Sequence, residues 1–239
     1  MNNNQLKIIA CVSMFIDHLG MLIFPQFEIF RLLGRIAMPI FAFFIAEGCR
    51  YTHNRLKYFL QIFILGVICQ IPYTGLDIIN GNFTELYFNI LITFSFSIVI
   101  CYCYIDFEKA FKAKDNKNSL KFGGLFLLSI VVSYSFLRFT DNILGFPVTV
   151  DYGIRGILLP VSAVLFTDKH KRLFSFSVCL IGFLIYFNKP LNTLIFSSIA
   201  ILLLFFYNGK RGSKKLKYLF YIFYPSHLAL LYLISCFVH

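Results

Sequence analysis

Apolar runs long enough to cross a membrane constrain this chain more than any other feature of its sequence. A bilayer core about 30 Å thick requires about 20 mostly apolar residues in one helix. The candidate runs are Leu6–Phe24, Phe30–Cys49, Tyr58–Tyr73, Tyr87–Ile105, Phe122–Phe139, Tyr152–Phe166, Leu173–Phe187, Leu191–Tyr207 and Tyr218–Val238. Hydrophobic residues make up 59% of the chain and charged residues only 14%, with a mean hydropathy of +0.76, outside the soluble globular range. The sequence therefore predicts an all-α integral membrane protein, a polytopic bundle of about nine transmembrane helices.

Basic residues cluster in alternate loops and predict the orientation of the bundle. Short loops rich in Lys and Arg stay in the cytoplasm. Most of the 22 Lys and Arg residues lie in four such loops, at 50–57, 109–121, 169–172 and 210–217. The loops between them hold Asp and Glu instead. We therefore expect a cytoplasmic N-terminus and an outside C-terminus. The net charge of +11 indicates topology and membrane lipid, not a nucleic-acid partner.

The first run argues against a signal peptide, and the cysteines argue against a metal site. The first run lacks a small-residue cleavage site, so we expect a retained helix and not a signal peptide. The seven Cys residues are scattered and mostly apolar in their surroundings, without the spacing of a metal site. We therefore predict no metal and interpret the cysteines as small buried hydrophobes.

Ionisable residues interrupt the first two runs. Asp17 and His18 lie more than halfway along the first, and Arg31 and Arg35 lie one helical turn apart near the start of the second. Such groups cost roughly 2.5–3.5 kcal/mol each at the centre of a membrane helix, so they face a bundle interior and usually mark a functional path. Because buried charges persist only in pairs, we expect Arg35 to pair with Asp17. The alternative is an ion pair that only locks two helices together.

His18 is the candidate general base. A neutral imidazole can accept a proton and return it near neutral pH. The alternative is a histidine that is merely hydrogen-bonded in the core. Near the other end of the chain, Pro225 must free a main-chain carbonyl one turn back, which in membrane helices usually happens beside a cavity. Tyr224 and His227 would overhang that cavity as donors or proton relays.

Two further groups of polar residues are candidates. The first would line an acceptor pocket and consists of Arg31, Glu47, Asp151 and Arg155. The second is cationic or amidic, lies at the predicted cytoplasmic rim and would bind phosphates. It consists of Arg50, Asn54, Arg55, Lys57, Asn208, Lys210 and Arg211.

Several local motifs resemble the TraX family, membrane proteins associated with N-terminal acetylation of conjugative pilin. The likeness covers almost the whole chain. We therefore expect residues 1–239 to form a single TraX-like transmembrane domain. The motifs are Ile16-Asp17-His18-Leu19-Gly20, Arg31 to Phe43, Glu47-Gly48 with Thr52 and Asn54, Lys57-Tyr58, Gln70-Ile71-Pro72, Asp151-Tyr152-Gly153 with Gly156, Tyr207 to Gly212, and Tyr221 to Leu228. The resemblance implies a multi-pass protein of the bacterial inner membrane that transfers acetyl groups, with acetyl-CoA as donor.

Residues and resemblance together suggest one mechanism. Coenzyme A would place its phosphates at the cytoplasmic rim, with its thioester arm threaded between the first, second, sixth and ninth runs. His18 would deprotonate the acceptor or carry the acetyl group briefly, and Arg35 would stabilise the oxyanion. Tyr224 and His227 would assist. The acceptor is expected to be an amine or a hydroxyl on a pilin, a peptide or a surface glycan.

Two other functions remain open from the sequence. A proton-coupled transporter or flippase would use Asp17, His18, Glu47 and Arg155 as a proton relay. A non-catalytic membrane scaffold of a conjugation or secretion system would need no buried histidine.

Overall fold

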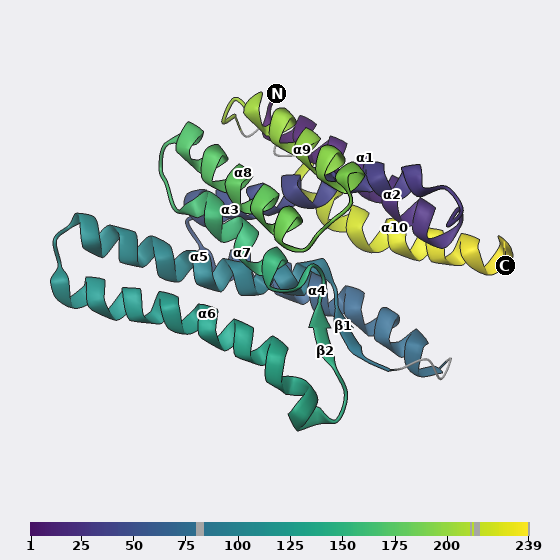
Figure 1. Ribbon diagram of the computed structural model, residues 1–239, viewed down its shortest axis with the longest axis horizontal. Helices are drawn as coiled ribbons and strands as arrows, with labels where there is room; N and C mark the ends of the chain where they lie inside the picture. The colour runs from purple at the N-terminus through teal and green to yellow at the C-terminus, as the bar shows by residue number, and fades with distance from the viewer. Residues whose placement is uncertain (80–83, 211, 213–215, 239) are drawn as a thin grey trace. The chain divides into compact units, whose positions relative to one another are not determined.

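The computed structural model describes residues 1–79, 84–210, 212 and 216–238, and this part of the chain is mostly helical (Figure 1). The helices are α1 (Asn3–Leu22), α2 (Glu28–Gly34), α3 (Ala37–Tyr51), α4 (Arg55–Ile79), α5 (Ile90–Lys112), α6 (Asn116–Leu144), α7 (Gly153–Val164), α8 (Lys169–Tyr186), α9 (Leu191–Phe205) and α10 (Leu216–Val238). Two short strands are β1 (Leu86–Phe88) and β2 (Val148–Val150).

Five helices of the described chain are long and apolar enough to cross a membrane. They are Asn3–Leu22, Glu28–Tyr51 (α2 with α3), Arg55–Pro72, Ile90–Lys112 and Asn116–Phe139. Shorter apolar helices cover Gly153–Val164, Leu191–Phe205 and Tyr221–Ser235. The expectation of a helical membrane protein is confirmed, with five candidate membrane-spanning helices in the described chain. The count of nine spans and the orientation of the termini stay predictions.

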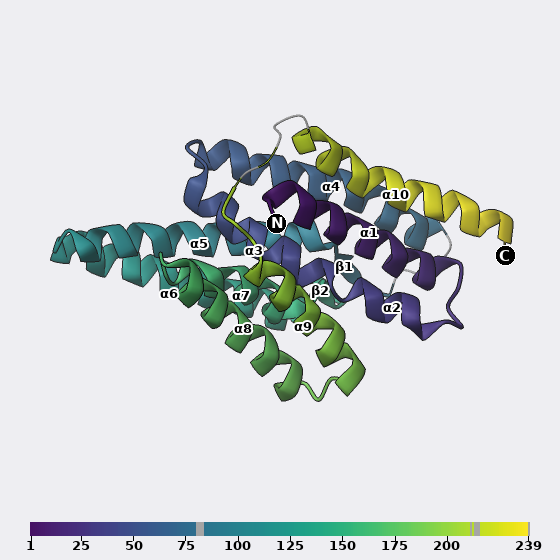
Figure 2. The ribbon, with the colours of Figure 1, turned by 90° about the horizontal axis from the view of Figure 1, so that it is seen from above.

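The chain forms two compact units, and it passes from one to the other within α3 and back again within α8. The first unit contains Met1–Phe41 and Leu173–His239, and the second contains Ala42–Arg172. In the first, α1 lies between α2 and α10 (Figure 2), and Leu6, Ala10 and Leu231 are among its most buried side chains. The single-domain expectation for the whole chain stays a prediction.

The second predicted span consists of two helices instead of one. α2 ends at Gly34 and α3 begins at Ala37. Between them the N–H of Arg35 bonds to the Leu32 carbonyl (3.1 Å) and that of Ile36 to the Leu33 carbonyl (3.4 Å). These bonds reach back three residues instead of four, which tightens the turn and interrupts the α-helix.

In the second unit, α5 is the central helix. It packs against α4, α6 and α7, and its Ile98, Ile100 and Cys101 are fully buried. Small polar residues bring α7 close, because Ser97 Oγ donates to the Ile157 carbonyl at 2.8 Å. By contrast, α6 exposes apolar side chains such as Leu127 along its length, as expected of a helix that faces lipid.

The two strands were not predicted, so the all-α expectation was wrong at this point. β1 and β2 pair in parallel, with Leu86 opposite Val148 and Phe88 opposite Val150. Each strand has only three residues, too few for a period-two pattern to stand out from the apolar runs beside it.

Candidate functional site

A pair of histidines forms the centre of the candidate site in the first unit. His18 comes from the last turns of α1, and His227 lies two residues after Pro225 in α10. Nε2 of His227 lies 3.4 Å from Nδ1 of His18, and the two rings meet edge to face with centroids 5.1 Å apart. The structure thus brings together two residues 209 positions apart in the chain.

Main-chain contacts determine which nitrogens of this pair carry protons. Nδ1 of His18 lies 2.9 Å from the Met14 carbonyl, and Nδ1 of His227 lies 2.7 Å from the Phe223 carbonyl. A carbonyl oxygen only accepts hydrogen bonds, so we assign a proton to Nδ1 of each neutral ring. The single proton on His18 Nδ1 is then shared between the Met14 carbonyl at 2.9 Å and His227 Nε2 at 3.4 Å. The lone pair of His18 Nε2 is left as the proton-accepting position of the pair.

Aromatic rings hold His227 in place. Phe223 stacks on it with centroids 4.6 Å apart and an interplanar angle of 8°, and Tyr224 meets its edge at 5.8 Å. His227 is 3% exposed and Tyr224 is 9% exposed. Pro225 lies inside α10, as the sequence predicts, and cannot donate to the Tyr221 carbonyl four residues earlier.

Asp17 pairs with Arg31, and the predicted pairing with Arg35 was wrong. Arg31 Nη1 donates to Asp17 Oδ2 at 2.7 Å and to the Asp17 carbonyl at 3.3 Å. Arg35 interacts electrostatically with Asp17 but forms no ion pair with any described residue. Asp17 Oδ1 is buried and has no hydrogen-bond partner among the described residues.

The close approach of α1 and α2 explains why Arg31, and not Arg35, pairs with Asp17. A Cβ atom on Gly34 would lie 2.2 Å from the Asp17 Cβ, so these two backbones nearly touch. A Cβ atom on Gly20 would likewise lie 2.5 Å from the Phe30 Cβ. Gly34 therefore occupies the position beside Asp17, and Arg31, one turn earlier on α2, reaches the carboxylate.

Glu47, expected to line a pocket, forms a buried ion pair in the second unit. Its partner is Arg172, and their side chains are 11% and 4% exposed. Arg172 also donates from Nε to the Ala163 carbonyl at 2.9 Å, and its guanidinium lies over the Phe43 ring. The sequence interpretation counted Arg172 only as a loop charge. The available signal was Glu47 itself, because a buried acid requires a cationic partner.

Two arginines expected to bind phosphate also pair with acids of α5. Arg50 bonds to Glu108 Oε2 at 3.1 Å and to the Val164 carbonyl, and Arg55 bonds to Asp106 Oδ2 at 2.7 Å. Asn54 caps the start of α4, with its Oδ1 accepting from the N–H of Lys57 at 2.9 Å. The Lys57 side chain is exposed. A phosphate-binding role for these four residues stays a prediction.

The other pocket candidates lie where β2 leads into α7. Tyr87 donates its hydroxyl to Asp151 Oδ1 at 2.7 Å, and Arg155 Nε donates to the Tyr152 carbonyl at 3.3 Å. Tyr152 has a φ of 61°, in the left-handed region that side chains rarely adopt, and Gly153 follows with a φ of 57°. Asp151 and Arg155 are thus held at the strained start of α7.

The basic turn at 207–212 binds to the start of α1. Asn208 N–H donates to the Met1 carbonyl at 2.9 Å, and the Lys210 carbonyl accepts from Asn3 N–H at 3.0 Å. Lys210 N–H donates to Asn208 Oδ1 at 3.0 Å. Two main-chain N–H groups of this turn, those of Asn208 and Lys210, are therefore used within the protein. The Lys210 side chain is exposed, and Arg211 lies outside the described residues.

The predicted site residues thus fall into two groups. The first unit joins Asp17 and His18 with Arg31, Tyr224 and His227. Glu47, Arg50 and Arg55 belong to the second unit. Within the described ranges, no cluster of three or more His, Cys, Asp or Glu side chains is suited to hold a metal ion.

Comparison with known proteins agrees with the motifs around these residues. The TraX protein family matches residues 2–235. The chain belongs to the TraX family. A relative from Dichelobacter nodosus, the probable fimbrial assembly protein FimC of serogroup H1, is 26% identical over 95% of this chain and 93% of its own length.

A second relative extends this TraX-family likeness without adding a function. The uncharacterized protein RP591 of Rickettsia prowazekii (strain Madrid E) is 29% identical over 70% of this chain and 56% of its own length. No solved structure matches the chain.

Proposed function

We propose that this TraX-family protein is a membrane-embedded acetyltransferase that moves an acetyl group from acetyl-CoA to an amine or hydroxyl acceptor. The observation that carries the proposal is the contact between the two histidine rings, with Nδ1 of each ring within hydrogen-bond distance of a main-chain carbonyl. Both Nδ1 atoms are committed to main-chain carbonyls, which leaves His18 Nε2 as a fixed proton acceptor inside an apolar bundle. A purely structural histidine does not require a second histidine to orient it.

In this mechanism His18 Nε2 takes the proton from the acceptor N–H or O–H. The acceptor nitrogen or oxygen forms a bond to the thioester carbonyl carbon, and the carbon–sulfur bond then breaks. The departing thiolate takes the proton back from His18, so the products are the acetylated acceptor and the free thiol. His227 stabilises the protonated His18 through its Nε2 acceptor, 3.4 Å from Nδ1.

Arg35 is the residue best suited to stabilise the oxyanion. Arg31 is already paired with Asp17 at 2.7 Å, whereas Arg35 has no ion-pair partner among the described residues. An unpaired guanidinium offers N–H donors to charge that develops only in the transition state. Asp17 and Arg31 would then position α2 beside the site.

The donor would extend along α1. The basic turn with Lys210 bonds to the start of this helix through Asn3, and His18 lies about 15 residues further along, roughly 22 Å at 1.5 Å per residue. Acetyl-CoA has its phosphates and its thioester at opposite ends of a long flexible arm. Phosphates near Lys210 would place the thioester deeper in the membrane, near His18.

The proposal also includes the orientation of the protein in the membrane and the class of molecule that accepts the acetyl group. We place this protein in the bacterial inner membrane with nine spans, its N-terminus in the cytoplasm and its C-terminus outside, on the basis of its basic loops. The Dichelobacter nodosus relative is named as a fimbrial assembly protein, which supports the N-terminal amine of a pilus subunit as the acceptor class.

The deciding experiment measures acetyl transfer by purified protein in detergent. The donor is labelled acetyl-CoA and the acceptor is a peptide with a free N-terminal amine. The same peptide with a blocked N-terminus is the negative control. His18→Ala should lower the transfer rate by about 10²–10⁴-fold, the usual loss for a general base.

His53→Ala is the matched control, because His53 is exposed and lies outside the site. Both variants must elute as monodisperse protein at the wild-type yield. A His18→Ala variant that keeps more than a tenth of the wild-type rate would show that His18 is structural. Wild-type protein that neither binds acetyl-CoA nor acetylates the peptide would favour the scaffold function.

A further inference from the structure

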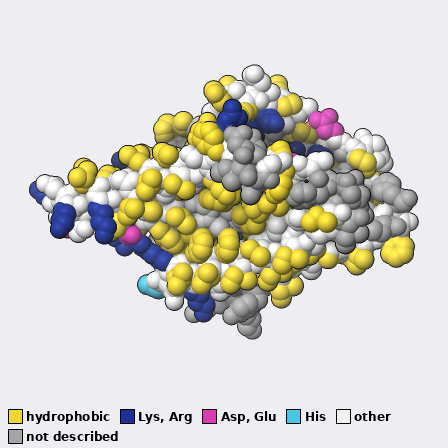
Figure 3. Space-filling view, turned by 90° about the horizontal axis from the view of Figure 1, so that it is seen from below, with side chains coloured by type: hydrophobic (Ala, Val, Ile, Leu, Met, Phe, Trp, Pro, Cys, Tyr) yellow, Lys and Arg dark blue, Asp and Glu magenta, His cyan; other side chains and the backbone are white. Residues whose placement is uncertain are grey.

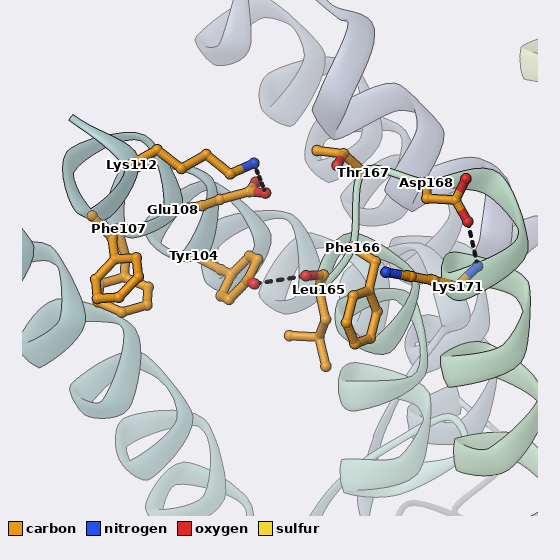
Figure 4. Close-up of a pocket in the computed structure, with 10 residues that line it drawn as sticks. Tyr104, Phe107, Glu108, Lys112, Leu165, Phe166, Thr167, Asp168 and Lys171 are labelled. Atoms are coloured by element: carbon orange, nitrogen blue, oxygen red, sulfur yellow. Dashed lines mark hydrogen bonds and ion pairs between the residues drawn. The ribbon is translucent and has the colours of Figure 1, made fainter. Parts of the chain in front are cut away.

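A cavity in the second unit is lined by residues other than those of the histidine pair. It has a volume of about 450 Å³ and lies between the last turns of α5 and the segment that joins α7 to α8 (Figure 4). Cavities of about 300–1,000 Å³ are typical of small-ligand sites. Nothing in the proposed acetyl transfer requires this cavity.

One part of the cavity wall is apolar. Phe107 and Phe111 contribute from α5, and Leu165 and Phe166 contribute from the segment after α7. The Tyr104 hydroxyl donates to the Leu165 carbonyl at 2.7 Å, so one polar group of this wall is already satisfied. A ligand must therefore present a hydrocarbon surface here.

The other part of the wall carries two lysines, Lys112 and Lys171. Two acids, Glu108 and Asp168, line the same part of the cavity, and both already have partners. Glu108 bonds to Lys112 at 2.7 Å and to Arg50 at 3.1 Å. Asp168 accepts from the main-chain N–H groups at the start of α8, including that of Lys171 at 3.0 Å.

The side chain of Lys171 extends from α8 toward Phe166 (Figure 4), and its ammonium forms no ion pair with a described residue. Lys112 shares Glu108 with Arg50, so that carboxylate does not neutralise both cations. The lining itself holds two lysines and two carboxylates, and Arg50 beside Glu108 adds a third cation. The cavity thus combines aromatic rings with cations that outnumber the acids by one. This combination suits an amphiphile with an anionic head.

The cavity also lies at the basic end of a membrane helix. α5 is one of the five helices long enough to span a bilayer, and its last turn holds Lys109 and Lys112. Figure 3 shows Lys and Arg side chains gathered at the tip of the α5–α6 hairpin, next to a broad apolar surface. In the proposed orientation this end faces the cytoplasmic leaflet, where anionic lipids concentrate.

We infer that this cavity binds one anionic phospholipid of the cytoplasmic leaflet, with its phosphate between Lys112 and Lys171 and its acyl chain against Phe107, Phe111 and Phe166. Basic pockets between membrane helices on this side are suited to anionic headgroups. The inference depends on the proposed orientation and is independent of acetyl transfer.

The test is lipid titration of delipidated protein in detergent, with bound lipid counted by native mass spectrometry. Phosphatidylglycerol should bind as one tight copy, and phosphatidylcholine, which has no net charge, should bind at least tenfold more weakly. Lys171→Gln should weaken phosphatidylglycerol binding by about fivefold, the effect of one charge near an anionic surface. Lys117→Gln is the matched control, because Lys117 is exposed in the same basic region and does not line the cavity.

Competition separates the lipid from a soluble phosphate compound. Glycerol 3-phosphate and 3′,5′-ADP should leave phosphatidylglycerol bound. Displacement by 3′,5′-ADP would overturn the inference and make the cavity a nucleotide site. Equal binding by Lys171→Gln and wild type would overturn it as well. His18→Ala should bind the lipid normally, so failure of the proposed catalysis leaves this result interpretable.

Discussion

The buried pair of Glu47 and Arg172 gives a sharp prediction for stability. Glu47→Ala removes the carboxylate and strands the Arg172 guanidinium, whose side chain is only 4% exposed. Removal of one partner from a buried pair costs about 3–5 kcal/mol, because the remaining charge stays desolvated. For a chain of this size, about 2–4 °C of melting temperature is lost per kcal/mol, so Tm should fall by about 6–20 °C.

Two comparisons isolate the stranded charge as the cause. In Glu47→Leu combined with Arg172→Met, no charge is buried, and Tm should return to within a few degrees of wild type. Asp106→Ala breaks the pair with Arg55, whose side chain is 34% exposed, and should cost about 1 kcal/mol or less.

Thermal unfolding of detergent-purified protein, followed by circular dichroism, measures all of these variants. A Glu47→Ala variant that melts within about 2 °C of wild type would refute the argument. A double variant that melts as low as the single one would refute it too, since the loss would then have another cause.

Three further predictions concern packing, pH and topology. Gly34→Ala should sharply reduce the yield of folded protein, because its Cβ would lie 2.2 Å from the Asp17 Cβ. Helix α2 would have to move by roughly 1.3 Å to restore an ordinary contact distance. Gly124→Ala is the control and should express normally, because a Cβ there meets nothing within 4 Å. Main-chain N–H groups of Lys171 and His170 hold the pKa of Asp168 below its usual value, so its stabilising effect is present above about pH 4 and is lost as the pH falls through the lowered pKa. The Tm difference between wild type and Asp168→Ala should therefore shrink on acidification from pH 6 to pH 3. A reporter fused after the C-terminus should be accessible from outside intact cells and one inserted at 113–115 should not; accessibility of both would contradict the nine-span topology.

Sequence reasoning predicts the class of fold because the bilayer leaves few alternatives. Long apolar runs must form helices, since main-chain polar groups find no water in the hydrocarbon core. Composition does not show where such a run breaks. The break follows Gly34, the residue at which α2 packs closely against Asp17 of another helix, and the β1–β2 pairing joins residues about 60 positions apart in the chain.

The sequence indicated which residues belong to the candidate site better than it indicated which of them pair with each other. Asp17, His18 and His227 stand out because polar groups are costly in a membrane span. Which arginine reaches Asp17 depends on the rotation of α2, and a glycine contact that no local pattern reveals determines it. Arg172 was missed as the partner of Glu47 because its position beside other basic residues resembled an ordinary cytoplasmic loop.

The parallel pairing of β1 and β2 has a consequence for the order in which this protein is made. Parallel strands require a crossover connection, and here the connection is the complete α5–α6 hairpin. β1 leaves the ribosome before either helix and has no partner until β2 follows them. Synthesis of the whole hairpin must therefore precede the pairing. The strand contact then holds Asp151 at the start of α7, with the Asp151 N–H bonded to the Phe88 carbonyl at 2.9 Å.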